Sequence, residues 1–502
     1  MSLRAFTLDD LVRRNALLHG NRAAFIHEGR TITHAQYAGR ISQLATGLAG
    51  LGVSTGERVA VLAPNSLEFA DLFGAAARLG AILAPINARL SAEEISHVIE
   101  DVEPAVVIAA AAMREQIPAA AIAGRRLVAL GEATDGWSRF EDLYASGARE
   151  TAAAIDSDAG LLIVHTAAVA GPARGAVLSH AGLMAAAQQA QACWQLGPDD
   201  VAVGVLPMFH VAGIGLMLAA QFAGGATLVL ARFDPEAVAA AIDRHGGSLM
   251  ATFPPMLGET ISAAERTGAT LASLRVVTGI DMPETITRFE EHCQGARFWA
   301  AYGQTETSGM VTMSPFRERP GSAGRPTPLN TVAIVDDADQ PAAPGQPGEI
   351  VVRGPMVFGG YWRRDADNAE TFRGGWHHTG DLGRFDADGY LWYQGRSPAK
   401  ELIKPGGENV YPAEVERTLC EHPDIVEAIV FGVPDPRWGE AVAAACICRP
   451  GATPEAQEVI EFVGGRIARY KKPARVYFLV DPPRTESGAI DRAAVKRMHG
   501  AS

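Results

Sequence analysis

The sequence predicts an α/β fold with two parts: a large N-terminal domain of mostly parallel sheets flanked by helices, and a small α+β C-terminal domain. Strand-like and helix-like patterns alternate through most of the chain, which is typical of βαβ units and parallel sheets. A chain of 502 residues is also too long for one compact core. The pattern changes near Gly395–Lys400, where glycine, serine and proline interrupt it. We therefore expect domains at 1–395 and 396–502.

Short apolar runs, caps and turn residues predict the elements of the large domain. The chain is expected to begin with an amphipathic helix capped by Thr7 or Asp9. Asp234 is a good N-cap, Pro235 suits the first helical position, and Gly246 suits the helix end. The other expected elements are strands at Arg58–Ala63, Ala81–Pro85, Leu161–Val164, Ala176–Leu178, Ala226–Ala231, Leu249–Phe253 and Ala296–Ala301, and a helix at Ser66–Leu79.

The small domain shows a different pattern, with strands that are not separated by regular helical crossovers. The expected strands are Ile425–Gly432, Val442–Cys448 and Val476–Val480, and the expected helices are Pro412–Cys420 and Pro454–Tyr470. Its size, roughly a hundred residues, is ordinary for a domain.

Composition excludes several classes of partner. The formal charge of −13, with no basic block to offset it, argues against nucleic acid. No apolar run reaches the ~20 residues of a membrane span, and the N-terminus lacks the apolar core of a signal peptide. The five cysteines are scattered, without a Cys-x-x-Cys pair. This pattern predicts a reduced cytoplasmic protein without structural zinc.

The most informative stretch is Gly374–Pro412, which reads GGWHHTGDLGRFDADGYLWYQGRSPAKELIKPGGENVYP. Core packing does not require Thr-Gly-Asp-Leu-Gly, Asp-Gly-Tyr, Gly-Arg and Gly-Gly-Glu-Asn at these spacings. In order and spacing, the stretch resembles the segment that joins the two domains in the adenylate-forming superfamily. That superfamily includes acyl-CoA synthetases, luciferases and the adenylation domains of peptide synthetases. The resemblance covers essentially the whole chain.

A second motif, AYGQTETSG, begins at Ala301 and resembles the family's Tyr-Gly-x-Thr-Glu at the edge of the nucleotide pocket. The resemblance implies that Tyr302 stacks on adenine, Thr305 contacts the α-phosphate and Glu306 helps to hold Mg²⁺. A carboxylate agrees with the oxygen ligands that Mg²⁺ prefers. The neighbouring nucleotide-binding positions are Gly303 and Gln304.

Four more residues receive roles from the same resemblance. Asp381 would accept hydrogen bonds from the ribose hydroxyls, and Arg396 would reach the ribose or a phosphate. Gly406 and Gly407 match the loop along which the CoA pantetheine arm runs, where glycine permits close backbone approach.

Lys400 and Lys404 match two lysines of plant-type aryl-CoA ligases, one at the hinge and one in the following loop. The gap between Arg396 and the first of these lysines is two residues longer in this chain than is usual in the family. The hinge residue can therefore be either Pro398 or Lys400.

The motif PMFHVAG, at Pro207–Gly213, resembles the family's Pro-x-Phe-His-x-x-Gly. The resemblance places His210 near the carboxylate substrate and the path of the thiol. The apolar stretch that follows, Val211–Leu218, offers no arginine or lysine to pair a second carboxylate. We therefore expect a monocarboxylate substrate with an apolar tail or ring.

The phosphate loop departs from the family pattern Thr-Ser-Gly-Thr-Thr-Gly-x-Pro-Lys-Gly. This chain has TAAVAGPARG at Thr166–Gly175, so three hydroxyls are missing. Each lost hydrogen bond is worth on the order of 1 kcal/mol. Thr166 and the backbone N–H groups remain, and Arg174 keeps the positive charge and can bind phosphate bidentately.

The pocket loop is also unusual. Ile280, Asp281 and Met282 follow Gly279 where the family has Gly-Ala-Pro, and they should narrow or reshape the pocket.

Ala489 occupies the position of the family lysine that bridges the substrate carboxylate and the α-phosphate during adenylation. Loss of that cation should slow the first half-reaction strongly. Either Ala489 is an engineered replacement, or the subfamily does without the lysine. In the second case Arg174, Lys400 or Lys404 compensates.

The resemblance thus implies an AMP-forming acid–CoA ligase that uses ATP, Mg²⁺ and CoA. A carboxylate and ATP would give acyl-AMP and pyrophosphate. The small domain would then rotate, and the CoA thiol would displace AMP. Two alternatives stay open: a nucleotide- or adenylate-binding homologue with impaired catalysis, and acyl transfer to a carrier-protein thiol. The sequence also leaves open whether the protein is a homodimer.

Overall fold

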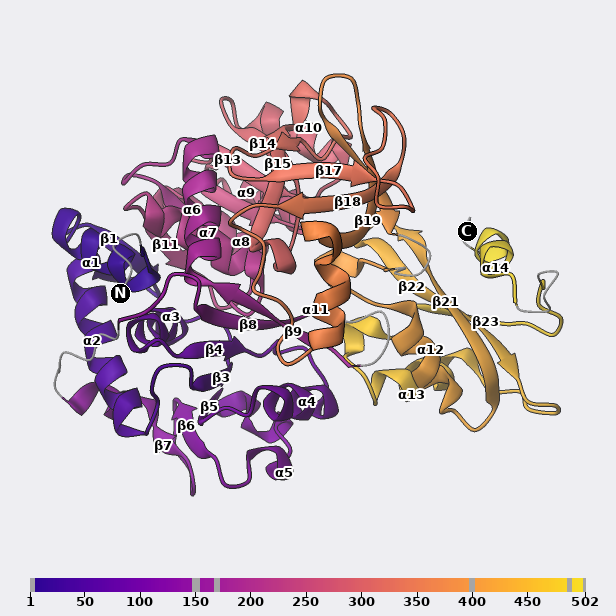
Figure 1. The fold of residues 1–502 in the computed structure, drawn as a ribbon, viewed down its shortest axis with the longest axis horizontal. Helices are drawn as coiled ribbons and strands as arrows, with labels where there is room; N and C mark the ends of the chain where they lie inside the picture. Colours follow the sequence, from indigo (N-terminus) through magenta and orange to yellow (C-terminus); the bar gives the residue numbers. More distant parts are fainter. Residues whose placement is uncertain (1–4, 147–153, 167–171, 397–401, 485–489, 500–502) are drawn as a thin grey trace.

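The structure is a computed structural model that describes residues 5–146, 154–166, 172–396, 402–484 and 490–499. The chain forms a large lobe up to Arg396 and a smaller lobe from residue 402 onward (Figure 1). Three sheets belong to the large lobe and a fourth to the smaller one. The predicted fold class is confirmed, whereas the domain boundary stays a prediction.

The first sheet has seven strands in the order β7-β6-β5-β3-β4-β8-β9. All neighbours are parallel except β8 and β9. The strands are β3 (Arg58–Leu62), β4 (Ile82–Pro85), β5 (Val106–Ala110), β6 (Arg126–Leu130), β7 (Ser138–Arg139), β8 (Gly160–Thr166) and β9 (Arg174–Ser179).

The second sheet has nine strands in the order β16-β15-β14-β13-β12-β10-β11-β1-β2, with antiparallel pairs at both edges and parallel pairs between them. The strands are β1 (Ala23–His27), β2 (Arg30–Thr33), β10 (Val201–Gly204), β11 (Ala226–Val229), β12 (Leu249–Thr252), β13 (Val276–Gly279), β14 (Arg297–Gln304), β15 (Gly309–Pro315) and β16 (Arg325–Pro326).

Helices between and around these sheets supply the core. Side chains of α2 (His34–Gly50), α3 (Leu67–Leu79), α6 (His180–Trp194) and α7 (Val211–Phe222) share one buried cluster with strands of both sheets. The predicted caps are confirmed at Thr7, Asp234 and Gly246. The remaining helices of the large lobe are α1 (Leu8–Leu18), α4 (Ala92–Val102), α5 (Ala119–Ile122), α8 (Pro235–His245), α9 (Met256–Thr267), α10 (Pro283–His292) and α11 (Asp365–Thr371).

The third sheet is antiparallel throughout, which the sequence analysis did not predict. Its strands are β17 (Thr331–Val335), β18 (Gly348–Arg353), β19 (His377–Phe385) and β20 (Leu391–Arg396). The last two strands contain much of the motif-rich stretch and carry Asp381 and Arg396.

The smaller lobe has the strands β21 (Ile425–Asp435), β22 (Gly439–Cys448) and β23 (Arg475–Phe478) and the helices α12 (Pro412–Cys420), α13 (Ala456–Gly464) and α14 (Arg492–His499). The helix predicted to reach Tyr470 is wrong at its end, because α13 stops at Gly464 before Gly465. Within the described part of the chain, no helix combines the length and apolar character needed to cross a membrane.

Candidate active site

A cavity of about 410 Å³ lies where the two lobes meet. The carboxyl ends of β13 and β14, the strands β19 and β20, and residues 404–440 of the smaller lobe contribute to its wall. Ligands of α/β proteins commonly bind at such carboxyl ends. Eleven predicted site residues line the cavity: Thr166, Arg174, His210, Gly303, Gln304, Thr305, Glu306, Asp381, Arg396, Lys404 and Gly407.

Glu306 is held by hydroxyl groups from two distant segments. Thr166 Oγ1 donates to Glu306 Oε1 at 3.1 Å, and the Tyr361 hydroxyl donates to the same oxygen at 2.9 Å. The guanidinium carbon of Arg174 lies 4.0 Å from the centroid of the Tyr361 ring, and Arg174 also pairs with Asp367 at 3.3 Å. The structure thus brings a carboxylate, two hydroxyls and a cation together, and a carboxylate is a type of ligand that Mg²⁺ prefers.

Asp381 is 2% exposed and accepts from several donors. The Tyr302 hydroxyl donates to Oδ2 at 2.7 Å, and Arg396 Nε lies 2.9 Å from Oδ1. The Tyr393 hydroxyl reaches Oδ1 at 3.4 Å, which is the longest of these contacts. A ribose hydroxyl that bound here would therefore most easily replace Tyr393.

Two predicted residues do not reach the wall. The Tyr302 ring stacks on Tyr393 with centroids 5.9 Å apart, and the Tyr302 hydroxyl donates to Asp381. The adenine contact of Tyr302 stays a prediction. Gly406 instead faces Trp438, and a Cβ at Gly406 would lie 2.8 Å from the indole. Lys400 and Ala489 fall outside the described residues.

His210 caps α7 through its side chain. Its Nδ1 accepts from the Ala212 N–H at 3.1 Å, so the neutral ring carries its proton on Nε2. Burial lowers the pKa of His210, which favours this neutral form at pH 7. The imidazole can therefore donate a hydrogen bond into the cavity.

Lys404 enters the same cavity from the smaller lobe. Its Nζ lies 5.6 Å from the centroid of the Tyr393 ring, and burial lowers its pKa. Its backbone N–H donates to the Glu440 carboxylate at 2.7 Å. Lys404 thus brings a cation to the Asp381 side of the cavity, and Glu440 fixes the backbone that carries it.

The remaining wall is mainly apolar. Ile280 and Met282 are 49% and 50% exposed and belong to the lining, as the pocket-loop prediction implied. Asp281 lies between them, and burial raises its pKa to about 6. The other apolar lining residues include Ala186, Ala190, Trp194, Val211, Ala212, Leu216, Ala251, Phe253, Ala301, Met310 and Met313.

A second cavity of about 220 Å³ adjoins the first. Thr166, His210, Thr305 and Asn409 line both. Helix α4 of the large lobe and helix α12 of the smaller lobe both contribute to the remaining wall. A ligand in the second cavity could therefore reach His210.

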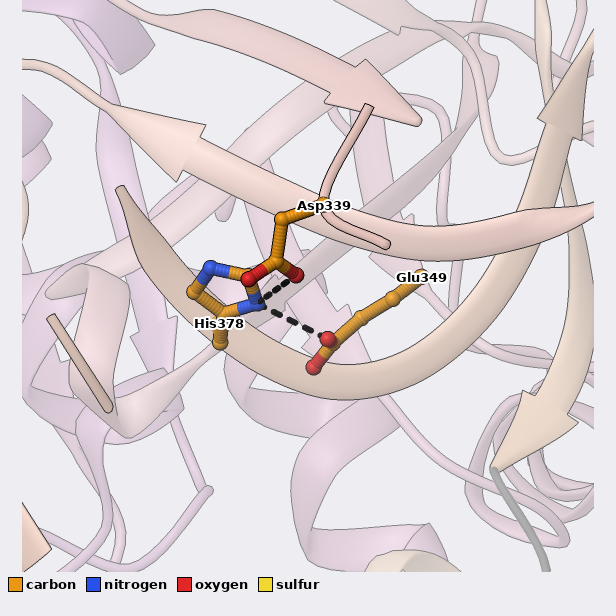
Figure 2. Close-up of side chains that lie close together, drawn as sticks. All are labelled: Asp339, Glu349 and His378. Carbon is orange, nitrogen blue, oxygen red and sulfur yellow. Dashed lines mark hydrogen bonds and ion pairs between the residues drawn. The ribbon is translucent and has the colours of Figure 1, made fainter. Parts of the chain in front are cut away.

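Asp339, Glu349 and His378 form the metal-like cluster in Figure 2. His378 Nδ1 lies 2.8 Å from Glu349 Oε2 and 3.9 Å from Asp339 Oδ1. The Arg373 guanidinium contacts both carboxylates, at 3.0 Å and 3.1 Å, and so already supplies a cation. This cluster is an ion network, and Glu306 is the better candidate for Mg²⁺.

Three tyrosines of the site were not predicted from the sequence. Tyr361 and Tyr411 line the main cavity, and Tyr393 contacts Asp381. Tyr411 also accepts from Arg396 at 2.7 Å. Their position beside glycine turns, within or near the motif-rich stretch, was the one available signal.

Comparison with known proteins agrees with this geometry. Residues 12–362 match the family described as AMP-binding enzyme, and residues 414–489 match the AMP-binding enzyme C-terminal domain. An indoleacetate–CoA ligase from Aromatoleum aromaticum is 36% identical over 501 residues, which cover 98% of each chain. A feruloyl-CoA synthase from an Amycolatopsis species is 34% identical over 495 residues, which cover 97% of this chain and 98% of that one.

A solved structure shows the same similarity along the chain. It is a double mutant of o-succinylbenzoate CoA synthetase (MenE) from Bacillus subtilis, bound with its product analogue. The TM-score is 0.85 at 27% identity, over 97% of this chain and 98% of that chain. The chain therefore belongs to the AMP-binding enzyme family, in the adenylate-forming superfamily of AMP-dependent acyl-CoA synthetases.

Proposed function

We propose that this protein is an AMP-forming acid–CoA ligase for a monocarboxylate with an aromatic ring or apolar chain. One observation carries the proposal. A single cavity joins the Glu306 cluster and the Asp381–Arg396 pair to an apolar wall, and a second cavity meets it at His210. Such a site can hold a nucleotide, an acid and a thiol together.

In the first half-reaction, a carboxylate oxygen would attack the α-phosphorus of ATP, and pyrophosphate would leave. Glu306, steadied by Thr166 and Tyr361, would hold Mg²⁺. When bound, Mg²⁺ neutralises phosphate charge and favours departure of the leaving group. Arg174 would bind phosphate oxygens, and Asp381 with Arg396 would orient the ribose.

In the second half-reaction, the CoA thiolate would attack the acyl carbon, and AMP would leave with the bonding electron pair. The second cavity would admit the pantetheine arm, which would pass Asn409, a residue that lines both cavities, and reach Gly407 in the first cavity. His210 would donate its Nε2–H to the acyl carbonyl oxygen as negative charge develops there, and Lys404 would offset charge on the departing phosphate.

Ala489 supports a second candidate function, an adenylate-binding homologue with impaired catalysis. The hydroxyl-poor phosphate loop points the same way. Purified protein with ATP, Mg²⁺, CoA and an acid panel separates the two. The panel begins with indoleacetate and ferulate, after the relatives named above, and adds fatty acids and a dicarboxylate. AMP release and acyl-CoA formation are measured together.

The ligase proposal predicts AMP release and acyl-CoA formation that depend on both acid and CoA. Glu306→Gln should lower the rate at least about tenfold, since it removes the charge that binds Mg²⁺. Glu28→Gln, an exposed glutamate far from the cavity, is the matched control. Nucleotide binding without AMP release from any acid would instead favour the impaired homologue. AMP release without CoA dependence would favour a carrier-protein thiol.

A further inference from the structure

Asp381 lies on a bulge of β19 that breaks the ladder with β18. Glu349 pairs with Leu382, but the next register pair is Val351 with His378. Thus Thr379, Gly380 and Asp381 stand opposite one residue, Ile350. Gly380 has a φ of +73°, a left-handed conformation that glycine adopts without strain.

A bulge leaves backbone groups without ladder partners, and Glu349 satisfies one of them. Glu349 Oε1 accepts from the Gly380 N–H at 2.8 Å. Thr379 Oγ1 closes the other side of the bulge by donating to the Ile350 carbonyl at 2.6 Å. The Asp381 N–H then donates to Thr379 Oγ1 at 3.1 Å. These contacts fix the backbone immediately before the Asp381 carboxylate.

The ion network in Figure 2 fixes Glu349 in turn. Its Oε2 lies 2.8 Å from His378 Nδ1 and 3.0 Å from an Arg373 nitrogen. The side chains of His378 and Glu349 are 3% and 19% exposed, whereas Asp339 at the outer edge is 41% exposed. One carboxylate oxygen therefore anchors Glu349, and the other holds the bulge.

We propose that Glu349 is a positioning residue for ribose recognition: by holding the Gly380 N–H, it sets the direction of the Asp381 carboxylate. This inference rests on the proposed function, because it takes the ribose hydroxyls as the ligand of Asp381. Glu349 itself does not line the cavity, so its effect is transmitted through the bulge.

The test uses the intact protein and three nucleotides: ATP, 2′-deoxy-ATP and 3′-deoxy-ATP. The readout is the ratio of kcat/KM for ATP to that for each deoxy analogue, which reports how well a ribose hydroxyl is recognised. Loss of a hydrogen bond to a charged group should reduce that ratio about tenfold in Asp381→Asn. The KM of the acid and the thermal unfolding midpoint are measured beside it.

Two variants of Glu349 separate the effect of side-chain length from the effect of side-chain charge. Glu349→Gln keeps the length and can still accept from Gly380, whereas Glu349→Asp keeps the charge but withdraws the acceptor by one methylene. We expect Glu349→Asp to lose several-fold in the deoxy ratio and Glu349→Gln to lose less, because its amide oxygen still reaches the Gly380 N–H although its amide nitrogen can no longer pair with Arg373. The acid KM should change little in both. Asp339→Asn, at the outer edge of the same network, is the control and should leave the ratio unchanged.

The outcomes distinguish failure of the positioning role of Glu349 from failure of the proposed function on which that role rests. A ratio that collapses in Asp381→Asn but persists in Glu349→Asp overturns the positioning role alone. A larger loss in Glu349→Gln than in Glu349→Asp also overturns it, because charge would then matter more than reach. If the natural protein does not discriminate against either deoxy analogue, the ribose role of Asp381 and the inference fall together.

Discussion

Tyr361 shows how one residue can connect parts of the site that lie far apart in the sequence. Its hydroxyl holds Glu306, which is 55 positions away, while its ring lies under the Arg174 guanidinium. A family motif marks Glu306 as a candidate metal ligand, but the tyrosine that steadies it carries no comparable local signal. Contacts of this kind depend on tertiary packing, which single-sequence motifs do not encode.

Asp281→Asn should stabilise the protein in a pH-dependent way. The folded pKa of about 6 lies above the unfolded value of about 3.9, so the ionised form is disfavoured by folding. The asparagine variant should gain up to ~3 kcal/mol of unfolding free energy at pH 8, at about 1.4 kcal/mol for each pKa unit. This gain should shrink as the pH falls toward 5, because the natural carboxyl then becomes protonated.

Thermal unfolding of both proteins at pH 8 and pH 5 measures the effect of Asp281→Asn. Glu284→Gln, on the exposed first turn of α10, is a control for loss of one negative charge. An Asp281→Asn gain of equal size at both pH values would contradict the assignment of a raised pKa.

Most predicted site residues meet in one cavity because their motifs lie at strand ends, in turns or, for Asp381, on the bulge of β19. Glu306 follows β14, while Asp381 and Arg396 lie on β19 and β20. The sequence could indicate these residues because the order and spacing of their motifs resemble those of the adenylate-forming superfamily. It could not show that Tyr302 faces Asp381, because the direction of a buried ring depends on its neighbours.

Among the elements, the described segment 402–411 of the smaller lobe packs against the large lobe at Gly407. Gly407 has a φ of +87°, and a Cβ there would lie 2.7 Å from the Phe253 ring. The chain approaches this closely because glycine has no side chain. The sequence predicted the glycines and several elements around them, such as α12, but not the aromatic ring against which Gly407 packs.

Gly407→Ala should slow acyl-CoA formation at least about tenfold, since the added methyl clashes with Phe253 and strains a left-handed position. The acid-dependent exchange of pyrophosphate into ATP should change less than twofold, since the Glu306 cluster is untouched. Gly451→Ala, at a left-handed glycine with no close neighbour, is the control. Equal losses in both half-reactions would contradict the idea that this loop serves the thiol step.

At the scale of the whole molecule, Lys471 joins the two lobes. It pairs with Glu94 of the large lobe and lies 2.8 Å from Glu414 of the smaller lobe. Glu94 also accepts from the backbone N–H of Ala468 at 3.1 Å. The Lys471 side chain is 5% exposed, and the two carboxylates raise its pKa although burial opposes them. Sequence patterns predicted each lobe. They could not predict the relative orientation of the two lobes, because that orientation depends on contacts between them.

Lys471→Met should weaken the contact that holds the two lobes in this relative orientation, because it leaves two carboxylates without their shared cation. The expected loss of stabilising free energy is about 3 kcal/mol. We expect the CoA-dependent step to slow more than acid-dependent pyrophosphate exchange. Stopped-flow measurement of each half-reaction tests this, with exposed Lys496→Met as the control. If the two steps slow equally, the lysine stabilises the fold rather than the orientation.

The bulge on β19 also limits how this chain can change during evolution. It adds two residues to one strand relative to β18, and side chains alternate between sheet faces with a period of two. An even insertion therefore preserves the inside–outside order on both sides of Asp381. A related protein could lose both added residues and keep the same side chains in its core. Deletion of a single residue would instead move the side chains of half of the strand to the opposite face of the sheet. Natural length variation here should therefore occur in steps of two.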